Sequence, residues 1–139
     1  MRVSARHPGV LVIGADQMLD CNGVWFDKPA DQAHARAHLQ ALRGKTHRLV
    51  TAAVVALNGS RIWHTIDTAT LTMRPFTDGF LDDYLDQVGP AVLSSVGAYH
   101  LEGRGAQLFS RIEGDFFTIL GLPLLPLLGF LRDHGALPK

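Results

Sequence analysis

Asp16 is the residue whose type and position most directly suggest catalysis. It follows the apolar and small residues LVIGA at positions 11–15, a pattern typical of a strand that ends at a polar tip. In open α/β sheets, ligands collect outside the carboxyl ends of the strands. A carboxylate placed there can hold a divalent cation or take a proton from water. Aspartate also caps turns and helices, so this motif alone leaves both roles open.

The other reactive side chains give weaker indications. His34 and His38 have the i, i+4 spacing of helical metal ligands, but no matching carboxylate accompanies them. We therefore expect both on the exposed side of an alanine-rich helix. Cys21 has no catalytic partner in its neighbourhood, and we expect it to fill a small apolar space. Trp63 is expected in the core or at a dimer surface.

Composition limits the class of protein. The 139 residues suffice for one domain with a core, and the 13 basic and 13 acidic side chains balance, which argues against nucleic acid or an anionic membrane as the main partner. A single cysteine cannot form an internal disulfide, which fits a reducing cytoplasm. The first nine residues do not resemble a signal peptide. The apolar stretch 116–131 is too short and too broken for a spanning helix, so we expect it in the core.

The first half of the chain predicts alternating strands and helices. Residues 1–6 resemble the end of a helix, residues 10–14 a strand covered on both faces, and residues 19–26 a small hairpin around Asn22-Gly23. Pro29 favours the start of a helix that continues to about Arg43. Its expected inner positions are Ala33, Ala37 and Leu42, with Gly44 just after its end.

The second half predicts a long hairpin followed by helices. Residues 47–57 and 61–73 form its expected strands, joined by Asn58-Gly59. Thr77 is placed to cap a helix that continues to residue 86 or 87. Residues 94–106 suggest a site loop, residues 116–120 a strand, and residues 123–134 a last helix. Together these elements predict an α/β or α+β fold with a mixed sheet.

Several motifs occur in one order along the chain. They are LVIGADQ, DKP, the Thr46-His47 pair, VGAYHLEG, the Gly105-Ala106 pair and IEGD followed by GLPL. In this order they resemble the Maf family of nucleoside triphosphate pyrophosphatases. The resemblance implies a single domain over residues 1–139, with an elongated mixed sheet, a long hairpin and flanking helices. It also implies a cytoplasmic homodimer that cleaves a nucleotide between its α and β phosphates and requires Mg²⁺ or Mn²⁺.

The resemblance also assigns roles to individual residues. Asp16 matches the family's proton acceptor and metal-side carboxylate, and Lys28 matches the lysine that faces the phosphates. Gln17 and Glu102 match substrate-contacting positions of the branch assigned to 7-methyl-GTP. These roles make chemical sense, because lysine and metal neutralise phosphate charge during attack. A glutamate can also accept hydrogen bonds from the N1–H and the amine of a guanine edge.

One part of the family pattern is absent. Family members carry an S-x-S-P-R-R loop before the GAD motif, and no such stretch precedes LVIGAD here. The chain therefore resembles the C-terminal two thirds of a member. Each charge-assisted contact from that loop is worth about 1.5–3 kcal/mol, so we expect this chain to hydrolyse nucleotides poorly. The alternative function is a catalytically weak or inactive fragment that binds nucleotides or pairs with another subunit.

Overall fold

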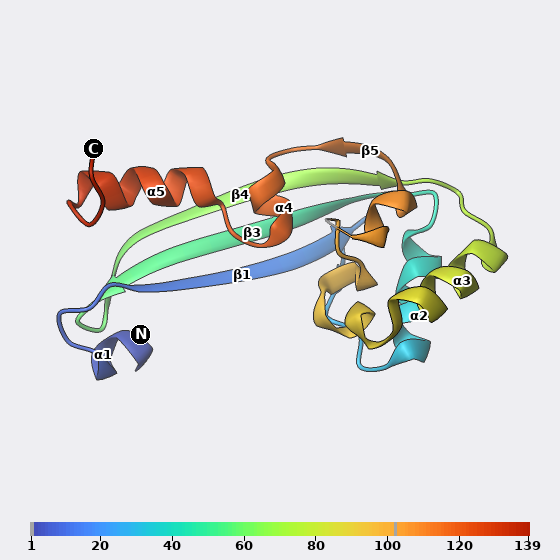
Figure 1. Cartoon of the computed structure of the whole chain (residues 1–139), viewed down its shortest axis with the longest axis horizontal. Helices are drawn as coiled ribbons and strands as arrows, with labels where there is room; N and C mark the ends of the chain where they lie inside the picture. The colour runs from blue at the N-terminus through green and yellow to red at the C-terminus, as the bar shows by residue number, and fades with distance from the viewer. Residues whose placement is uncertain (1, 102) are drawn as a thin grey trace. The chain divides into compact units, whose positions relative to one another are not determined.

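The computed structural model describes residues 2–101 and 103–139. Helices and strands alternate along the chain, with short 3₁₀ turns before the last strand (Figure 1). The elements are α1 (Arg2–Arg6), β1 (Val12–Cys21), β2 (Val24–Phe26), α2 (Gln32–Leu42), β3 (Thr46–Leu57), β4 (Ser60–Met73), α3 (Asp78–Val88), η1 (Gly89–Ser94), η2 (Val96–Ala98), η3 (Arg104–Leu108), β5 (Phe109–Glu113), α4 (Phe116–Leu120) and α5 (Leu124–Asp133). The strand order in the sheet is β2-β1-β3-β4-β5. The predicted α/β class with flanking helices is confirmed.

Two Asn-Gly turns build the hairpins. Asn22 and Gly23 have φ values of 54° and 85°, and Asn58 and Gly59 have 51° and 83°. Positive φ at both central residues is the requirement of a type I′ turn, which asparagine followed by glycine meets most readily. Both predicted hairpins are therefore confirmed. β1 pairs with β2, and β4 pairs with β5, in the antiparallel sense.

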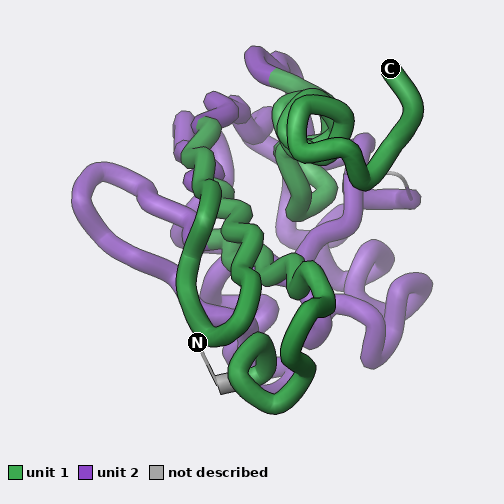
Figure 2. The backbone as a smooth tube through the Cα atoms, turned by 90° about the vertical axis from the view of Figure 1, so that its left-hand side faces the viewer, with its two compact units in different colours: residues 1–17, 51–67, 115–139 green, residues 18–50, 68–114 purple. Residues whose placement is uncertain are grey.

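The described chain divides into two compact units (Figure 2). Unit 1 contains residues 1–17, 51–67 and 115–139, and unit 2 contains residues 18–50 and 68–114. Strands β1, β3 and β4 each contribute residues to both units. The single domain over residues 1–139 stays a prediction.

Helix α2 of unit 2 begins later than its sequence predicted. Asp31, not Pro29, precedes its first turn, because the Asp31 carboxylate accepts a hydrogen bond from the backbone N–H of His34 (2.8 Å). Residues Ala35, Leu39 and Leu42 form the buried stripe. The prediction of Ala33 and Ala37 as inner positions is wrong, since both are exposed.

Two further expectations concern the surroundings of α2. His38 is half-buried rather than exposed, because its ring packs edge-on against Phe26, with 5.1 Å between the ring centroids. Cys21 is buried and free, as expected for an apolar space filler. Burial raises the pKa of the Cys21 thiol, which keeps it protonated and unreactive.

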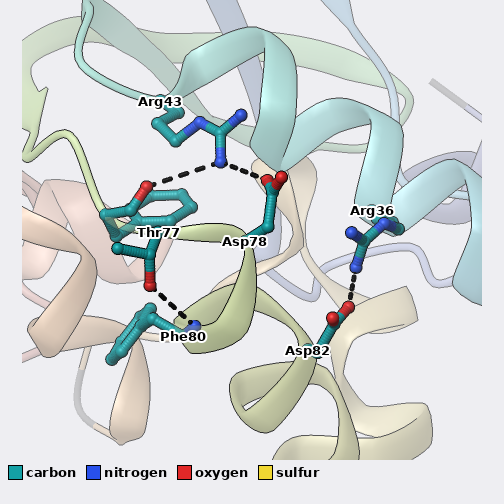
Figure 3. A network of polar contacts seen from close by, with 7 residues as sticks. Arg36, Arg43, Thr77, Asp78, Phe80 and Asp82 are labelled. Atoms are coloured by element: carbon teal, nitrogen blue, oxygen red, sulfur yellow. Dashed lines mark hydrogen bonds and ion pairs between the residues drawn. The ribbon is translucent and has the colours of Figure 1, made fainter.

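Polar contacts join α2 to α3 within unit 2 (Figure 3). Arg43 donates to the Asp78 carboxylate at 2.6 Å, and Arg36 forms an ion pair with Asp82. Thr77 caps α3 as predicted, since its hydroxyl oxygen accepts from the N–H of Phe80 (3.1 Å). These contacts fix the start of α3 beside α2.

Residues 116–120 of unit 1 form helix α4, so the prediction of a strand is wrong. The Asp115 carboxylate accepts from the Thr118 N–H at 2.9 Å, which satisfies a free donor of the first turn. Gly121 then adopts the left-handed conformation that ends a helix. These two caps outweigh the strand preference of the aromatic and β-branched residues between them.

The apolar stretch 116–131 is only partly buried. Phe116 and Leu125 are 50% and 58% exposed, whereas Ile119 and Leu127 are buried. The expectation that this stretch forms core is therefore wrong for its exposed side chains, because the short capped helix α4 and the helix α5 each turn one face outward. These side chains are Phe116, Phe117, Leu120 and Leu125. The strand expected at residues 10–14 is also not covered on both faces, since Ile13 is 47% exposed.

Among the described residues, no helix is both long and apolar enough to cross a bilayer.

Candidate active site

Asp16 lies near the middle of β1 and not at the end of a strand, so the predicted strand tip is wrong. Its side chain is exposed. One of its carboxylate oxygens accepts a hydrogen bond from the backbone N–H of Gln17, at 2.9 Å. β2 pairs with β1 only from Leu19 to Cys21, so Asp16 belongs to the part of β1 that has no strand on that side among the residues described. The carboxylate is thus held at a sheet edge, accessible to solvent.

The neighbouring residue of β1, Gln17, makes very different contacts. Its side chain is half-buried, and its Nε2 atom lies 3.1 Å from the Thr51 hydroxyl oxygen. The same nitrogen lies 3.1 Å and 3.0 Å from the carbonyl oxygens of Thr118 and Ile119. Successive side chains of a strand point to opposite faces, which explains why Asp16 faces solvent while Gln17 enters unit 1.

Two buried threonines extend this polar network in unit 1. The Thr51 hydroxyl donates to the Thr118 carbonyl oxygen at 3.0 Å, and both side chains are fully buried. The Thr118 hydroxyl donates to the Asp67 carboxylate of β4 at 2.7 Å. The network therefore links β1, β3, β4 and α4 through groups that satisfy one another, as buried polar groups require.

The other two predicted site residues lie elsewhere. Lys28 belongs to unit 2, in the connection between β2 and α2, where its side chain is exposed. Glu102 lies outside the described residues. Of the four predicted residues, the structure places Asp16 and Gln17 together in unit 1.

The loop expected to carry Glu102 is anchored by buried aromatic residues of unit 2. The Tyr84 hydroxyl donates to the Ala98 carbonyl oxygen at 3.0 Å. The Tyr99 hydroxyl lies 2.7 Å from Nε2 of His47, a side chain that is 1% exposed. Burial lowers the pKa of His47 to about 4 and raises the pKa of Tyr99. Both groups are therefore uncharged near neutral pH, and the loop start at residues 96–99 is packed rather than open.

A small hollow of about 160 Å³ lies beside α3 in unit 2. Its lining residues are Phe80, Asp83, Tyr84, Gln87, Arg104 and Gln107. Arg104 already donates to the Gln87 side-chain oxygen at 2.7 Å. Arg104 keeps its charge in this contact, but the Asp83 carboxylate in the same lining weakens the attraction of the hollow for a phosphate.

The Maf-like protein family model matches residues 1–134 of the chain. The chain belongs to the Maf family. The nucleoside triphosphate pyrophosphatase of Paramagnetospirillum magneticum is 67% identical over 137 residues, which are 99% of this chain and 71% of that protein. The protein of the same name from Granulibacter bethesdensis is 59% identical, over 98% of this chain and 69% of its own length. The 7-methyl-GTP pyrophosphatase of Rhizobium etli is 55% identical, over 97% and 68%.

The residues of this Maf protein are compatible with a divalent metal that the substrate helps to hold. No group of three or more histidine, cysteine, aspartate or glutamate side chains comes together as a metal site in the described ranges. An all-protein metal cage is thus not supported there. Mg²⁺ commonly binds one or two carboxylates together with substrate phosphates and water. The exposed Asp16 carboxylate, with one oxygen hydrogen-bonded to Gln17, fits that smaller role.

The sequence of this Maf protein did not indicate the buried threonines that contact Gln17, the neighbour of Asp16 in β1. Thr51 and Thr118 stand 67 positions apart, and neither belongs to a motif with a spacing that suggests chemistry. The sequence contains one usable signal, which is a threonine in an otherwise apolar part of β3. A buried hydroxyl needs a partner, but the sequence does not indicate which one.

Proposed function

We propose that this Maf protein is a nucleoside triphosphate pyrophosphatase, a hydrolase acting on acid anhydrides. The observation that carries the proposal is the 67% identity, over 99% of this chain, to a protein of that name. The exposed carboxylate of Asp16 at the sheet edge supports it. The substrate class is a nucleoside triphosphate, and the products are a nucleoside monophosphate and pyrophosphate.

In the proposed reaction, water attacks phosphorus at the bridge between the α and β phosphates. Asp16 accepts the proton that water loses, and the bridging P–O bond breaks as the new P–O bond forms. The ammonium group of Lys28 offsets negative charge on the phosphates. Bound Mg²⁺ or Mn²⁺ would neutralise further phosphate charge, with Asp16 as its protein ligand. Lys28 is exposed, which leaves its ammonium accessible to a ligand.

We further propose a guanine-type base, as in 7-methyl-GTP. The 55% identical Rhizobium etli protein bears the name 7-methyl-GTP pyrophosphatase. Glu102 would accept hydrogen bonds from the N1–H and the exocyclic amine of guanine, whereas it would meet acceptors on uracil or thymine. A comparison of kcat/KM for 7-methyl-GTP, GTP, UTP and dTTP tests this preference. Equal values for all four nucleotides would contradict it.

We also propose a cytoplasmic homodimer. The free, buried Cys21 is compatible with a reducing compartment. The dimer follows from the family resemblance, and sedimentation velocity tests it. A single species of about 15 kDa at micromolar concentration would contradict the dimer.

Product analysis tests the proposed activity directly. The purified chain is mixed with GTP, 7-methyl-GTP or UTP and Mg²⁺ or Mn²⁺, and the products are separated by ion-exchange chromatography. The proposal predicts monophosphate and pyrophosphate in equal amounts. Nucleotide binding without any turnover would instead support the fragment that only binds nucleotides. Release of orthophosphate and a diphosphate would place cleavage at the wrong bond.

A further inference from the structure

We infer that a clamp made by Tyr84, Tyr99 and His47 positions the loop at residues 94–106 for the nucleotide without touching the ligand. The inference rests on the proposed function, because that function assigns recognition of the base to this loop. All three side chains belong to unit 2 and are almost entirely buried. They are therefore positioning residues and not catalytic ones.

The backbone of this loop turns sharply at Gly97 and Ala98. Both residues have positive φ, at 76° and 63°. Glycine adopts this conformation readily, whereas the Cβ atom of alanine crowds the following carbonyl oxygen. A strained conformation of this kind persists only where the surrounding structure holds it, and such conformations cluster at functional sites. The neighbours of Ala98 therefore identify what holds the turn.

Tyr84 of α3 holds the turn through its hydroxyl. This hydroxyl donates to the Ala98 carbonyl oxygen at 3.0 Å, while the Ala98 N–H donates to the Ser95 carbonyl oxygen at 3.2 Å. Ala98 is fully buried, so both of its backbone groups need partners within the protein. Without the Tyr84 hydroxyl the carbonyl would lose this donor, and the left-handed conformation would lose part of its support.

Tyr99 holds the same turn through its ring. A Cβ atom at Gly97 would lie 2.6 Å from Cε2 of Tyr99, so the ring lies directly against the turn. The Tyr99 hydroxyl lies 2.7 Å from Nε2 of His47, and Phe109 packs against the ring with 4.8 Å between the centroids. Residues of β3 and β5 thus fix the ring, and the ring fixes the turn.

The turn determines the path of the residues that follow it. The Gly103 N–H donates to the His100 carbonyl oxygen at 3.1 Å, and a Cβ atom at Gly105 would lie 2.4 Å from the same oxygen. Nε2 of His100 lies 2.9 Å from the Ser94 hydroxyl oxygen. The described chain thus folds back closely on His100, and a shift of the turn would displace the residues that flank Glu102 in the sequence.

Tyr84→Phe and Tyr99→Phe test the clamp, because each variant removes one hydroxyl and keeps the ring. A displaced loop should recognise guanine less well, so we expect the GTP to UTP ratio of kcat/KM to fall about tenfold in each variant. Partial unfolding would instead lower kcat/KM for both nucleotides by the same factor. An unchanged ratio in either variant would overturn the inference.

Thr77→Ala is the matched control. It removes another hydrogen bond of α3, the one that the Thr77 hydroxyl oxygen accepts from the Phe80 N–H, and so destabilises the helix that carries Tyr84. It should lower the melting temperature without changing the GTP to UTP ratio. An equal fall of the ratio in Thr77→Ala would show that lost stability alone causes the effect, which would also overturn the inference.

A second readout does not depend on turnover. Amide hydrogen exchange is measured over residues 96–101. The inference predicts exchange about tenfold faster in Tyr84→Phe and Tyr99→Phe, with Thr77→Ala like the unmodified chain, and equal exchange in all four chains overturns it. If the unmodified chain releases no pyrophosphate, or treats GTP and UTP alike, the proposed activity or the proposed guanine preference fails by itself. Exchange then decides the inference.

Discussion

Nε2 of His47 lies 2.7 Å from the hydroxyl oxygen of Tyr99 in the interior of unit 2. The rings of both residues also pack against Phe109, at centroid distances of 5.9 Å and 4.8 Å. Nδ1 of His47 is buried and has no hydrogen-bond partner within the described part of the chain. A protonated imidazole would carry an unpaired donor and an unpaired charge here, so the fold requires the neutral ring.

This burial predicts that acid destabilises the protein. The pKa of His47 is about 4 in the folded chain, against an ordinary value of 6.5. Between these values the unfolded chain binds more protons than the folded chain, so the free energy of unfolding rises with pH. We expect it to fall by about 2 kcal/mol from pH 7 to pH 5. Urea unfolding at pH 5, 6 and 7 measures this change.

His47→Phe is the control for the pH effect. Phenylalanine fits the aromatic surroundings but cannot titrate, so the slope between pH 5 and 7 should largely disappear, whatever the change in stability at pH 7. A variant that keeps the full slope would show that another group causes it.

The cap of α4 predicts a local loss of stability. Asp115→Ala removes the acceptor of the Thr118 N–H, which should cost about 1 kcal/mol. Asp115→Ser retains a capping oxygen and should recover most of that loss. Thermal unfolding followed by circular dichroism provides the measurement. Equal melting temperatures for the alanine and serine variants would contradict the cap.

Gly114 has to be glycine because β4 approaches it closely. A Cβ atom at this position would lie 2.7 Å from Cβ of Ala69, and the φ of Gly114 is 140°. Gly114→Ala should cost about 1–3 kcal/mol from crowding in addition to the strain of its backbone. Gly9→Ala is the matched control, since Gly9 also has positive φ but an open surrounding. Chemical unfolding that gives both variants the same free energy would show that crowding contributes nothing.

Lys28 should affect nucleotide binding and not folding. Its side chain is exposed, so neither Lys28→Met nor Lys28→Arg should change the melting temperature by more than about 1 °C, given the small effect of most surface substitutions. We expect Lys28→Met to lower kcat/KM about tenfold or more, because a charge-assisted phosphate contact is worth about 1.5–3 kcal/mol. Lys28→Arg keeps the charge and should retain more of the activity. Unchanged kcat/KM in Lys28→Met would remove Lys28 from the site.

Local signals made much of the fold predictable. The two Asn-Gly turns and the Thr77 cap act within a few residues of themselves, so the sequence indicated them correctly. Where two local signals compete, the sequence pattern did not decide which element forms or where it begins. The aromatic and β-branched residues of 116–120 favoured a strand, but Asp115 and Gly121 cap a helix there. In the same way, Asp31 rather than Pro29 caps the first turn of α2. The start of the helix therefore moves, and with it the set of residues that face the core.

The candidate site was predictable only in part, for a related reason. The GAD motif identified Asp16 as an accessible carboxylate. The partners of Gln17 come from β3 and α4, up to 102 positions away, and no periodicity or spacing connects them. The exposed apolar side chains of α4 and α5 were likewise assigned to the core, because hydropathy alone does not show which face of a short helix turns outward.

The central claim is that the Asp16 carboxylate accepts the proton in nucleotide hydrolysis. Asp16→Asn keeps the shape of the side chain and removes its basicity, and Asp86→Asn provides the control at another exposed aspartate. The measurement is pyrophosphate release under saturating GTP or 7-methyl-GTP with Mg²⁺, alongside melting temperature. The account predicts a kcat lower by about 10²–10⁴-fold for Asp16→Asn, and full activity for Asp86→Asn. A kcat for Asp16→Asn within twofold of the unmodified chain would contradict it.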